Sequence, residues 1–230
     1  ELKSRGVKII AVSNPTRVDE QTRRLKSIFD EWIDIKGLQP SIAAQKIYAA
    51  GPHGLIDLAG YTDGGLMELF AYKSAPVQLE WLGYLSTTGL PEMDYFIADE
   101  TTTNEQASKF FSEKLIRING CHLGYSLPEI EIGTTEPPIL KNGHVTFGSF
   151  NNPLKLNDKV LDVWSDILRE VESSVLRIQA KHTDRAFVCE NIHRRFAEKG
   201  IMRDKIKFVS PKKSPSYFES YNEVDICLDT

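Results

Sequence analysis

The sequence predicts an α/β protein made of two Rossmann-like lobes, each built on a parallel sheet. Two observations support this fold class. Short apolar runs alternate with segments of helical periodicity, which is typical of parallel strands covered by helices. One stretch without periodicity, rich in proline, glycine and threonine, separates two such series. We therefore divide the chain into an N-terminal lobe at 1–119, a linker at 120–143 and a C-terminal lobe at 144–230, and we expect a cleft between the lobes.

The first predicted element is a buried strand at residues 7–12, a largely apolar run. Apolar residues at helical spacing predict a helix over 19–32. Ser41 is the expected N-cap of a second helix, which ends at Gly51. The other elements expected in this lobe are strands at 55–58, 77–82, 95–98 and 114–118, and helical segments at 66–72 and 104–111.

The second lobe repeats the alternation and centres on the segment 147–158. A short strand runs into a polar turn with Asn151, Asn152 and Lys155, and then into a helix. Such a turn presents backbone N–H groups and a helix N-terminus to an anion, and the lysine adds a mobile positive charge. The alternative is an ordinary strand–helix connection with solvated polar residues. The elements expected in this lobe are strands at 144–149, 175–179, 206–209 and 224–228, and helices at 157–171, 184–199 and 216–222.

The overall composition is that of a globular protein without a nucleic-acid or membrane surface. Of the 230 residues, 41% are hydrophobic and 26% are charged, and the net charge is −4. Nucleic-acid and anionic-membrane binding need a basic face, so this charge argues against both. No apolar run approaches the ~20 residues of a membrane span, and the start of the chain lacks the apolar region of a signal peptide. We therefore expect a cytoplasmic protein.

The sequence contains no metal-binding or nucleotide-binding signature of known spacing. The three cysteines form no CxxC pair and no Cys/His cluster, so no metal site is expected. Neither GxGxxG nor GxxxxGK[ST] is present, which argues against a dehydrogenase or a P-loop enzyme. The remaining polar candidates are interpreted as turn, capping or surface groups: His53, Asp57, Ser86, Thr87, Thr88, Asp94, His122, His144, His182 and His193.

Both ends of the chain are expected to be cut. A strand begins within a few residues of Glu1, and the chain stops at Thr230, where a buried strand should lead into a loop. Loops that follow strands carry function in α/β proteins, so natural termini seldom fall there. We interpret the chain as a fragment.

Several runs of the sequence are together characteristic of one family. They are APVQLEWLGY at 75–84, TTGLPEMDY at 87–95, FGSFNN at 147–152 with Lys155, and YNEVDICLDT at 221–230, with GYT at 60–62 and SEKL at 112–115 at matching spacings. On these residues the chain resembles the protein O-linked N-acetylglucosamine transferase/SPINDLY family over nearly its whole length.

The resemblance implies two lobes in the GT-B arrangement, with a nucleotide-sugar donor in the cleft. The expected reaction transfers N-acetylglucosamine from UDP-GlcNAc to serine or threonine of an acceptor protein. Enzymes of this family are inverting and metal-independent, so no cofactor is expected. Departure of the nucleoside diphosphate builds negative charge, which protein groups must then stabilise without a metal.

The resemblance also implies the roles of five residues. Lys155 matches the family's phosphate-contacting lysine and is the expected catalytic residue, which also binds the donor. Asn152 falls where the family places an amide against the nucleotide. Leu82 and Gly83 match positions close to the sugar. Tyr217 falls near a position, often histidine, on the helix that faces the nucleotide.

The chain also departs from the family's pattern. The family's first strand, with its histidine loop, would precede the chain, and a glycine–threonine–threonine loop that holds the diphosphate would follow it. The fragment alone is therefore expected to bind the donor weakly and to be inactive. Leu85-Ser86 stands where Pro-Gly is common, Tyr48 replaces a histidine of some members, and no tetratricopeptide array precedes the lobes.

Three alternatives stay open. The resemblance to the SPINDLY branch allows GDP-fucose as the donor, which would make the protein an O-fucosyltransferase. A second alternative is a non-catalytic scaffold that binds a nucleotide sugar. A third is an unrelated α/β binding module whose matches to the family are accidental.

Overall fold

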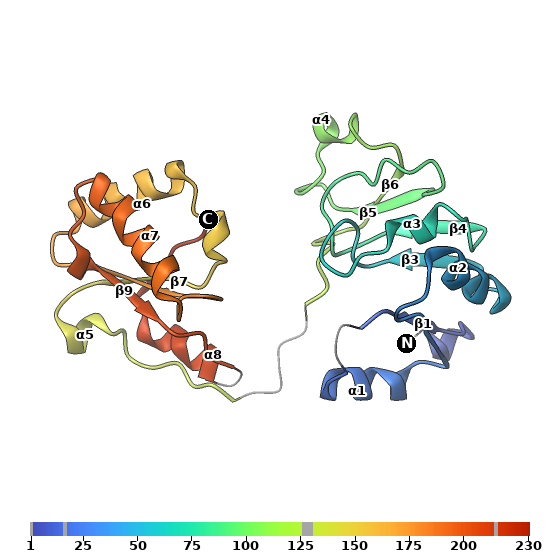
Figure 1. Ribbon diagram of the computed structural model, residues 1–230, viewed down its shortest axis with the longest axis horizontal. Coiled ribbons are helices and arrows are strands. Elements are labelled where there is room, and N and C mark those ends of the chain that lie inside the picture. The colour runs from blue at the N-terminus through green and yellow to red at the C-terminus, as the bar shows by residue number, and fades with distance from the viewer. Residues whose placement is uncertain (1, 16–17, 126–130, 214–215) are drawn as a thin grey trace. The chain divides into compact units, whose positions relative to one another are not determined.

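The computed structural model describes residues 2–15, 18–125, 131–213 and 216–230 (Figure 1). The chain divides into two compact units, Glu1–Ser126 and Leu127–Thr230. This division falls inside the predicted linker at 120–143, of which residues 126–130 lie outside the described part of the chain.

The first unit contains two parallel sheets. Strands β1 (Ile10–Ser13) and β2 (Glu31–Asp34) form a pair. A separate four-stranded sheet has the order β3-β4-β5-β6. Its strands are β3 (Gly54–Asp57), β4 (Val77–Glu80), β5 (Tyr95–Ala98) and β6 (Lys114–Arg117). The consecutive order and the parallel pairing place the carboxyl ends of all four strands at one edge of the sheet.

Helices of the first unit differ from the prediction in two places. The helix expected over 19–32 is α1 (Glu20–Ile28) only, because Phe29 adopts an extended conformation and the chain continues into β2, which contains Trp32. In α2 (Pro40–Ala49), Gln39 is the N-cap instead of Ser41. A proline at the first helical position has its φ angle already set for the helix, so it moves the start upstream. Three shorter helices complete the unit: Lys3–Arg5, α3 (Met67–Phe70) and α4 (Glu105–Ser108).

The second unit contains one four-stranded parallel sheet with the order β10-β7-β8-β9. Its strands are β7 (Thr146–Ser149), β8 (Val175–Gln179), β9 (Ile206–Val209) and β10 (Ile226–Cys227). From β7 the chain builds outward through β8 and β9, and then crosses to the other side of β7 to form β10. This reversal between β7 and β10 is the topological switch point, where open parallel sheets bind ligands at the carboxyl ends of their strands.

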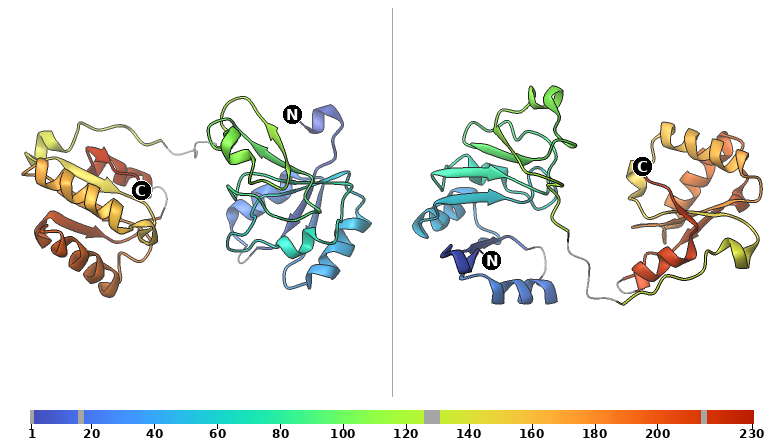
Figure 2. Two further views of the ribbon diagram at one scale, coloured as in Figure 1. Left: turned by 90° about the horizontal axis from the view of Figure 1, so that it is seen from above. Right: turned by 180° about the vertical axis from the view of Figure 1, so that it is seen from behind.

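Two long helices cover one face of this sheet, α6 (Asp158–Glu170) and α7 (Ala186–Glu198) (Figures 1 and 2). Their apolar side chains form a continuous core with those of the strands. The main members of this core are Phe147, Leu161, Trp164, Leu168, Leu176, Ile178, Ile192, Phe196 and Ile206. The helix predicted over 157–171 therefore forms as α6, with its apolar side chains in this core.

Shorter elements of the second unit include one that was not expected. A helix, α5 (Ile139–Asn142), forms within the segment interpreted as an aperiodic linker, where Pro138 precedes it and Gly143 ends it in a left-handed conformation. One helical turn is too short to produce a detectable period. The others are the 3₁₀ turns Pro153–Lys155 and Arg203–Lys205, and α8 (Ser216–Glu219) with the 3₁₀ turn Ser220–Glu223.

Together the two units confirm the predicted α/β class with parallel sheets. Within the described residues, no helix has both the length and the apolar character needed to cross a membrane.

The fully buried Leu161 tests the core of the second unit. We expect Leu161→Ala to lower the free energy of unfolding by about 2–5 kcal/mol, because it removes apolar contacts and leaves a cavity. Val163→Ala is the matched control on the same helix, since its side chain is 56% exposed, and should cost about 0.5 kcal/mol or less. Denaturant unfolding followed by hydrogen exchange in α6 measures both. Equal effects of the two substitutions would contradict this assignment of the core.

Candidate functional site

The switch point of the second unit joins the loops that follow β7 and β10. Asn151 follows β7, and its side-chain amide donates to Oδ1 of Asp229, which follows β10, over 2.8 Å. The backbone N–H of Thr230 donates to the same carboxylate. These two hydrogen bonds, together with the nearby charge of Lys155, hold the pKa of Asp229 below its ordinary value. Two loops far apart in sequence are thus connected at the carboxyl edge of the sheet.

Asn152 and Lys155 lie in the turn between β7 and α6. The side-chain oxygen of Asn152 accepts the backbone N–H of Leu154 and so caps the 3₁₀ turn. Lys155 ends that turn with an exposed side chain, and its ammonium group makes no hydrogen bond or ion pair to any residue of the described chain. Asn157 then caps the N-terminus of α6 by accepting the N–H of Val160. The turn therefore places the ammonium group of Lys155, which has no partner among the described residues, beside the positive end of a helix dipole.

Tyr217 belongs to an aromatic cluster at the same edge. Its ring packs edge-on against Phe150, which follows β7, with ring centroids 5.9 Å apart. Phe150 also stacks on Tyr221, with ring centroids 4.0 Å apart. The hydroxyl groups of Tyr217 and Tyr221 lie 3.2 Å apart. The structure therefore brings Tyr217 to the turn that contains Asn152 and Lys155, through Phe150.

Leu82 and Gly83 belong to the first unit and follow β4 directly. The N–H of Gly83 donates to the carbonyl of Trp81 over 3.0 Å, and Leu82 between them has φ = 79°. This is the geometry of a classic γ-turn, which is rare and strained for a residue with a side chain. Strained backbone of this kind persists only where the surrounding structure holds it in place.

The loops after β3 and β4 fit together through glycines. A Cβ atom added to Gly83 would lie 2.1 Å from the carbonyl oxygen of Leu58. A Cβ on Gly60 would lie 2.2 Å from Cβ of Tyr84, and one on Gly65 would lie 1.9 Å from the oxygen of Gly60. A side chain at any of these three positions would overlap its neighbour, and the contacts of Gly83 with Leu58 and of Gly60 with Tyr84 hold the two loops together.

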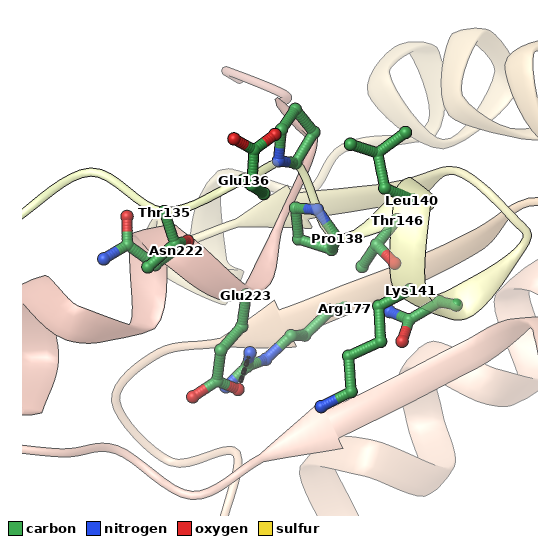
Figure 3. Close-up of a pocket in the computed structure, with 11 residues that line it drawn as sticks. Thr135, Glu136, Pro138, Leu140, Lys141, Thr146, Arg177, Asn222 and Glu223 are labelled. Atoms are coloured by element: carbon green, nitrogen blue, oxygen red, sulfur yellow. Dashed lines mark hydrogen bonds and ion pairs between the residues drawn. The ribbon is translucent and has the colours of Figure 1, made fainter.

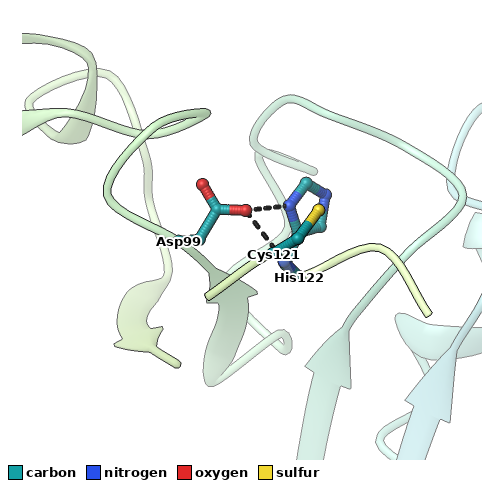
Figure 4. Close-up of side chains that lie close together, drawn as sticks. All are labelled: Asp99, Cys121 and His122. Carbon is teal, nitrogen blue, oxygen red and sulfur yellow. Dashed lines mark hydrogen bonds and ion pairs between the residues drawn. The ribbon is translucent and has the colours of Figure 1, made fainter. Parts of the chain in front are cut away.

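Sequence reasoning missed a hydrogen-bonded Asp99–His122 pair at the carboxyl end of β5. Nδ1 of His122 lies 2.6 Å from Oδ2 of Asp99, and both residues are buried (Figure 4). The N–H groups of His122 and Thr102 and the imidazole ring hold the pKa of Asp99 well below its ordinary range. Trp81 donates its indole N–H to the carbonyl of His122 over 2.9 Å, which ties the start of the Leu82 turn to this pair. Asp99 and His122 are 23 residues apart in the sequence, and Trp81 and His122 are 41 apart, so no local spacing could have indicated these contacts.

Cys121 lies beside this pair, so that one ligand atom of each of the three side chains falls within 4.8 Å of the others. The expectation of no metal site was based on spacing alone. The nitrogen and oxygen atoms of His122 and Asp99 are 2.6 Å apart, whereas two ligands around a tetrahedral zinc ion would be separated by ~3.3 Å, as follows from bond lengths of ~2.0–2.1 Å. The present geometry is therefore that of a hydrogen-bonded pair.

A pocket of about 520 Å³ lies elsewhere in the second unit, at the amino end of β7 (Figure 3). Its lining includes Lys141, Thr146 and an ion pair between Arg177 and Glu223. None of the residues predicted to bind a donor contributes to it. The strands of this parallel sheet present their carboxyl ends at the opposite edge, so this pocket is separate from the switch-point site.

Comparison with known proteins identifies relatives of the chain. Residues 12–124 match the family model described as glycosyl transferase family 41. The chain is 33% identical, over 97% of its length, to a probable UDP-N-acetylglucosamine–peptide N-acetylglucosaminyltransferase SPINDLY of Eustoma exaltatum subsp. russellianum. It is 26% identical, over 92% of its length, to the probable transferase SEC of Arabidopsis thaliana. It spans 25% and 22% of these two proteins, or about a quarter of their length.

A solved structure also resembles the chain. It is a lysine-to-methionine mutant of the Thermobaculum terrenum O-GlcNAc transferase, with a TM-score of 0.90 and 27% sequence identity. The similarity covers 96% of this chain and 42% of that one. The fold described above is therefore the fold of that enzyme over the matched region.

The contact between Gly83 and Leu58 tests the geometry of the turn. We expect Gly83→Ala to lower the free energy of unfolding by about 1–3 kcal/mol, because the new methyl group would overlap a backbone carbonyl. Gly124→Ala is the control, since a Cβ atom there meets nothing within 4 Å, and it should change stability by less than about 0.5 kcal/mol. Denaturant titration measures both. A Gly83→Ala protein as stable as the control would contradict the close approach of the two loops.

Proposed function

The chain belongs to glycosyl transferase family 41, and from this premise we propose that it carries the donor-binding and catalytic residues of a protein O-glycosyltransferase. The proposed reaction transfers N-acetylglucosamine from UDP-GlcNAc to serine or threonine of an acceptor protein. The names of the SPINDLY and SEC relatives support this donor and this class of acceptor. The observation that carries the proposal is the uncommitted ammonium group of Lys155 at the switch point between β7 and β10.

In the proposed mechanism the acceptor hydroxyl attacks the anomeric carbon from the face opposite the leaving group, which inverts the configuration, and the hydroxyl proton is released to solvent. The bond between that carbon and the β-phosphate oxygen breaks, and UDP leaves with an additional negative charge. We propose that Lys155 and the N–H groups at the start of α6 stabilise this charge. A protein ammonium group in this role makes a metal ion unnecessary, so the proposed mechanism is metal-independent.

The other predicted residues receive roles in donor binding. Asn152, beside Lys155, is proposed to contact the nucleotide through its amide N–H₂ group, because its oxygen already caps the turn. Tyr217, held by Phe150, is proposed to contact the nucleotide through its ring. Leu82 and Gly83 form the rigid turn that is proposed to contact the sugar.

Replacement of Lys155 tests the catalytic role. We expect Lys155→Met, made in the intact protein, to lower the rate of sugar transfer to a serine- or threonine-containing peptide by about 10²–10³-fold, because one preorganised charge-stabilising group is lost. Lys159→Met is the matched control, since Lys159 is an exposed lysine of α6 four residues away. Circular dichroism shows whether both variants keep the fold. Undiminished transfer by Lys155→Met would exclude Lys155 as the catalytic residue.

A competition experiment decides the donor. We expect UDP to displace bound UDP-GlcNAc at lower concentration than GDP does, and radiolabelled N-acetylglucosamine to appear on the acceptor. Preference for GDP, with fucose transferred from GDP-fucose, would replace the proposed donor with that of an O-fucosyltransferase. Donor binding without transfer of either sugar by an otherwise folded protein would instead favour a nucleotide-sugar-binding scaffold.

A further inference from the structure

Two carboxyl side chains lie next to each other beneath the loops of the first unit. Asp57 ends β3, Glu80 ends β4, and the two residues are direct neighbours in the parallel register. Neighbours in register project from the same face of a sheet, so the two side chains lie side by side. Asp57 is 8% exposed and Glu80 is fully buried.

Glu80 contrasts with Gln78, which lies two residues earlier on the same buried face of β4. The Gln78 amide is fully satisfied, because it donates to the carbonyls of Phe70 and Glu92. It also accepts the N–H of Ser74. No group of the described chain donates a hydrogen bond to either carboxyl oxygen of Glu80. An ionised Glu80 would therefore be a buried charge without compensation, which is one of the costliest arrangements in a protein.

The surroundings favour a proton on Glu80. Burial, then the adjacent charge of Asp57 and a hydrogen bond between the two carboxyl groups, raise the pKa of Glu80 to about 9, with a smaller contribution from the charge of Glu113. The charges of Asp57 and Glu113 both oppose the ionisation of Glu80. Two carboxyl groups in contact hold one proton between them, because the repulsion between two adjacent negative charges disfavours ionisation of both.

Asp57 in turn shapes the loop that follows β3. Its two carboxylate oxygens accept the N–H of Gly60 over 2.8 Å and the N–H of Ala59 over 3.3 Å. Its backbone carbonyl accepts the N–H of Trp81, the first residue after β4. The same loop supplies the Leu58 carbonyl against which Gly83 is packed. The conformation of the turn after β4 therefore depends, through these backbone contacts, on the position of the Asp57 carboxylate.

We propose that Glu80 is a positioning residue, which as a neutral acid beside Asp57 holds the β3 loop, and through it the Leu82–Gly83 turn, in the donor-binding form. The part concerning the donor rests on the proposed function. When Glu80 loses its proton to solvent, two adjacent carboxylates repel each other. Asp57 then moves from the N–H groups of the loop, and the turn loses the support that holds Leu82 at positive φ.

The first test does not depend on activity. The backbone amide resonances of Gly60 and Gly83 are followed by NMR from neutral pH to about pH 10, one unit above the pKa of Glu80. We expect both resonances to shift together in the alkaline range in the unaltered protein and to stay constant in Glu80→Gln, which keeps the shape but cannot ionise. Glu105→Gln removes an exposed carboxylate of α4 and should leave the titration unchanged.

The pH dependence of stability tests independently whether Glu80 carries this proton. The folded protein keeps a proton that unfolded Glu80 releases near its ordinary pKa of 4.5. The free energy of unfolding should therefore fall as pH rises from about 4.5 to about 9, and Glu80→Gln should remove this fall. Either of two results would overturn the proposal. One is a shift of the Gly60 and Gly83 resonances at alkaline pH that persists in Glu80→Gln. The other is a carboxylate band of Glu80 at neutral pH in the infrared difference spectrum between the unaltered protein and that variant.

The second test concerns the donor. Between neutral pH and one unit above the pKa of Glu80, we expect the affinity for UDP-GlcNAc to fall about tenfold more in the unaltered protein than in Glu80→Gln, because ionisation of Lys155 and of the donor affects both proteins alike. At neutral pH the variant should bind as well as the unaltered protein. An alkaline loss of equal size in the two proteins would overturn the positioning role. If the protein binds no UDP-GlcNAc at any pH, the proposed function fails, while the titration of Gly60 and Gly83 still decides the state of Glu80.

Discussion

The parallel pairing of the strands is the constraint on which the rest of the structure depends. Every strand pair in the described part of the chain is parallel, so each sheet gathers the loops after its strands at one edge. Those loops must satisfy their own polar groups, because no strand ladder continues there. In the first unit this is done by buried carboxylates and glycine contacts, and in the second by side-chain amides and helix caps.

The two edges therefore differ in chemistry. The edge of the first unit contains acceptors that are already in use: Asp57 holds loop N–H groups and Asp99 holds His122. Its loops are consequently rigid. The edge of the second unit instead offers donors, in the Asn152 amide, the Lys155 ammonium group and the start of α6. Rigid turns suit contact with a neutral sugar, and free donors suit an anionic diphosphate.

The sequence predicted the elements whose signal is local. The strands at 95–98, 175–179 and 206–209 have the predicted bounds, and α6 lies within one residue of its prediction at each end. The helix predicted through Trp32 was wrong because apolar residues at helical spacing also suit a short helix followed by a strand. The switch-point turn could be placed from its strand–turn–helix pattern, and the residues proposed to bind the donor come from the family resemblance. The γ-turn at Leu82 and the Asp99–His122 pair could not, because both are made by contacts between segments distant in sequence.

The availability of Lys155 follows from how its neighbour Asp229 is satisfied. A lysine next to a carboxylate usually forms an ion pair, and a phosphate would then have to compete with that carboxylate for the ammonium group. Here Asn151 and the backbone N–H of Thr230 both donate to Oδ1 of Asp229, and Lys155 acts on this carboxylate only through its charge. The interaction between an exposed lysine and a carboxylate that it does not touch is weak and is screened by salt. The ammonium group thus stays beside the positive end of α6 without a strong partner, which is the state that a site for a departing diphosphate requires.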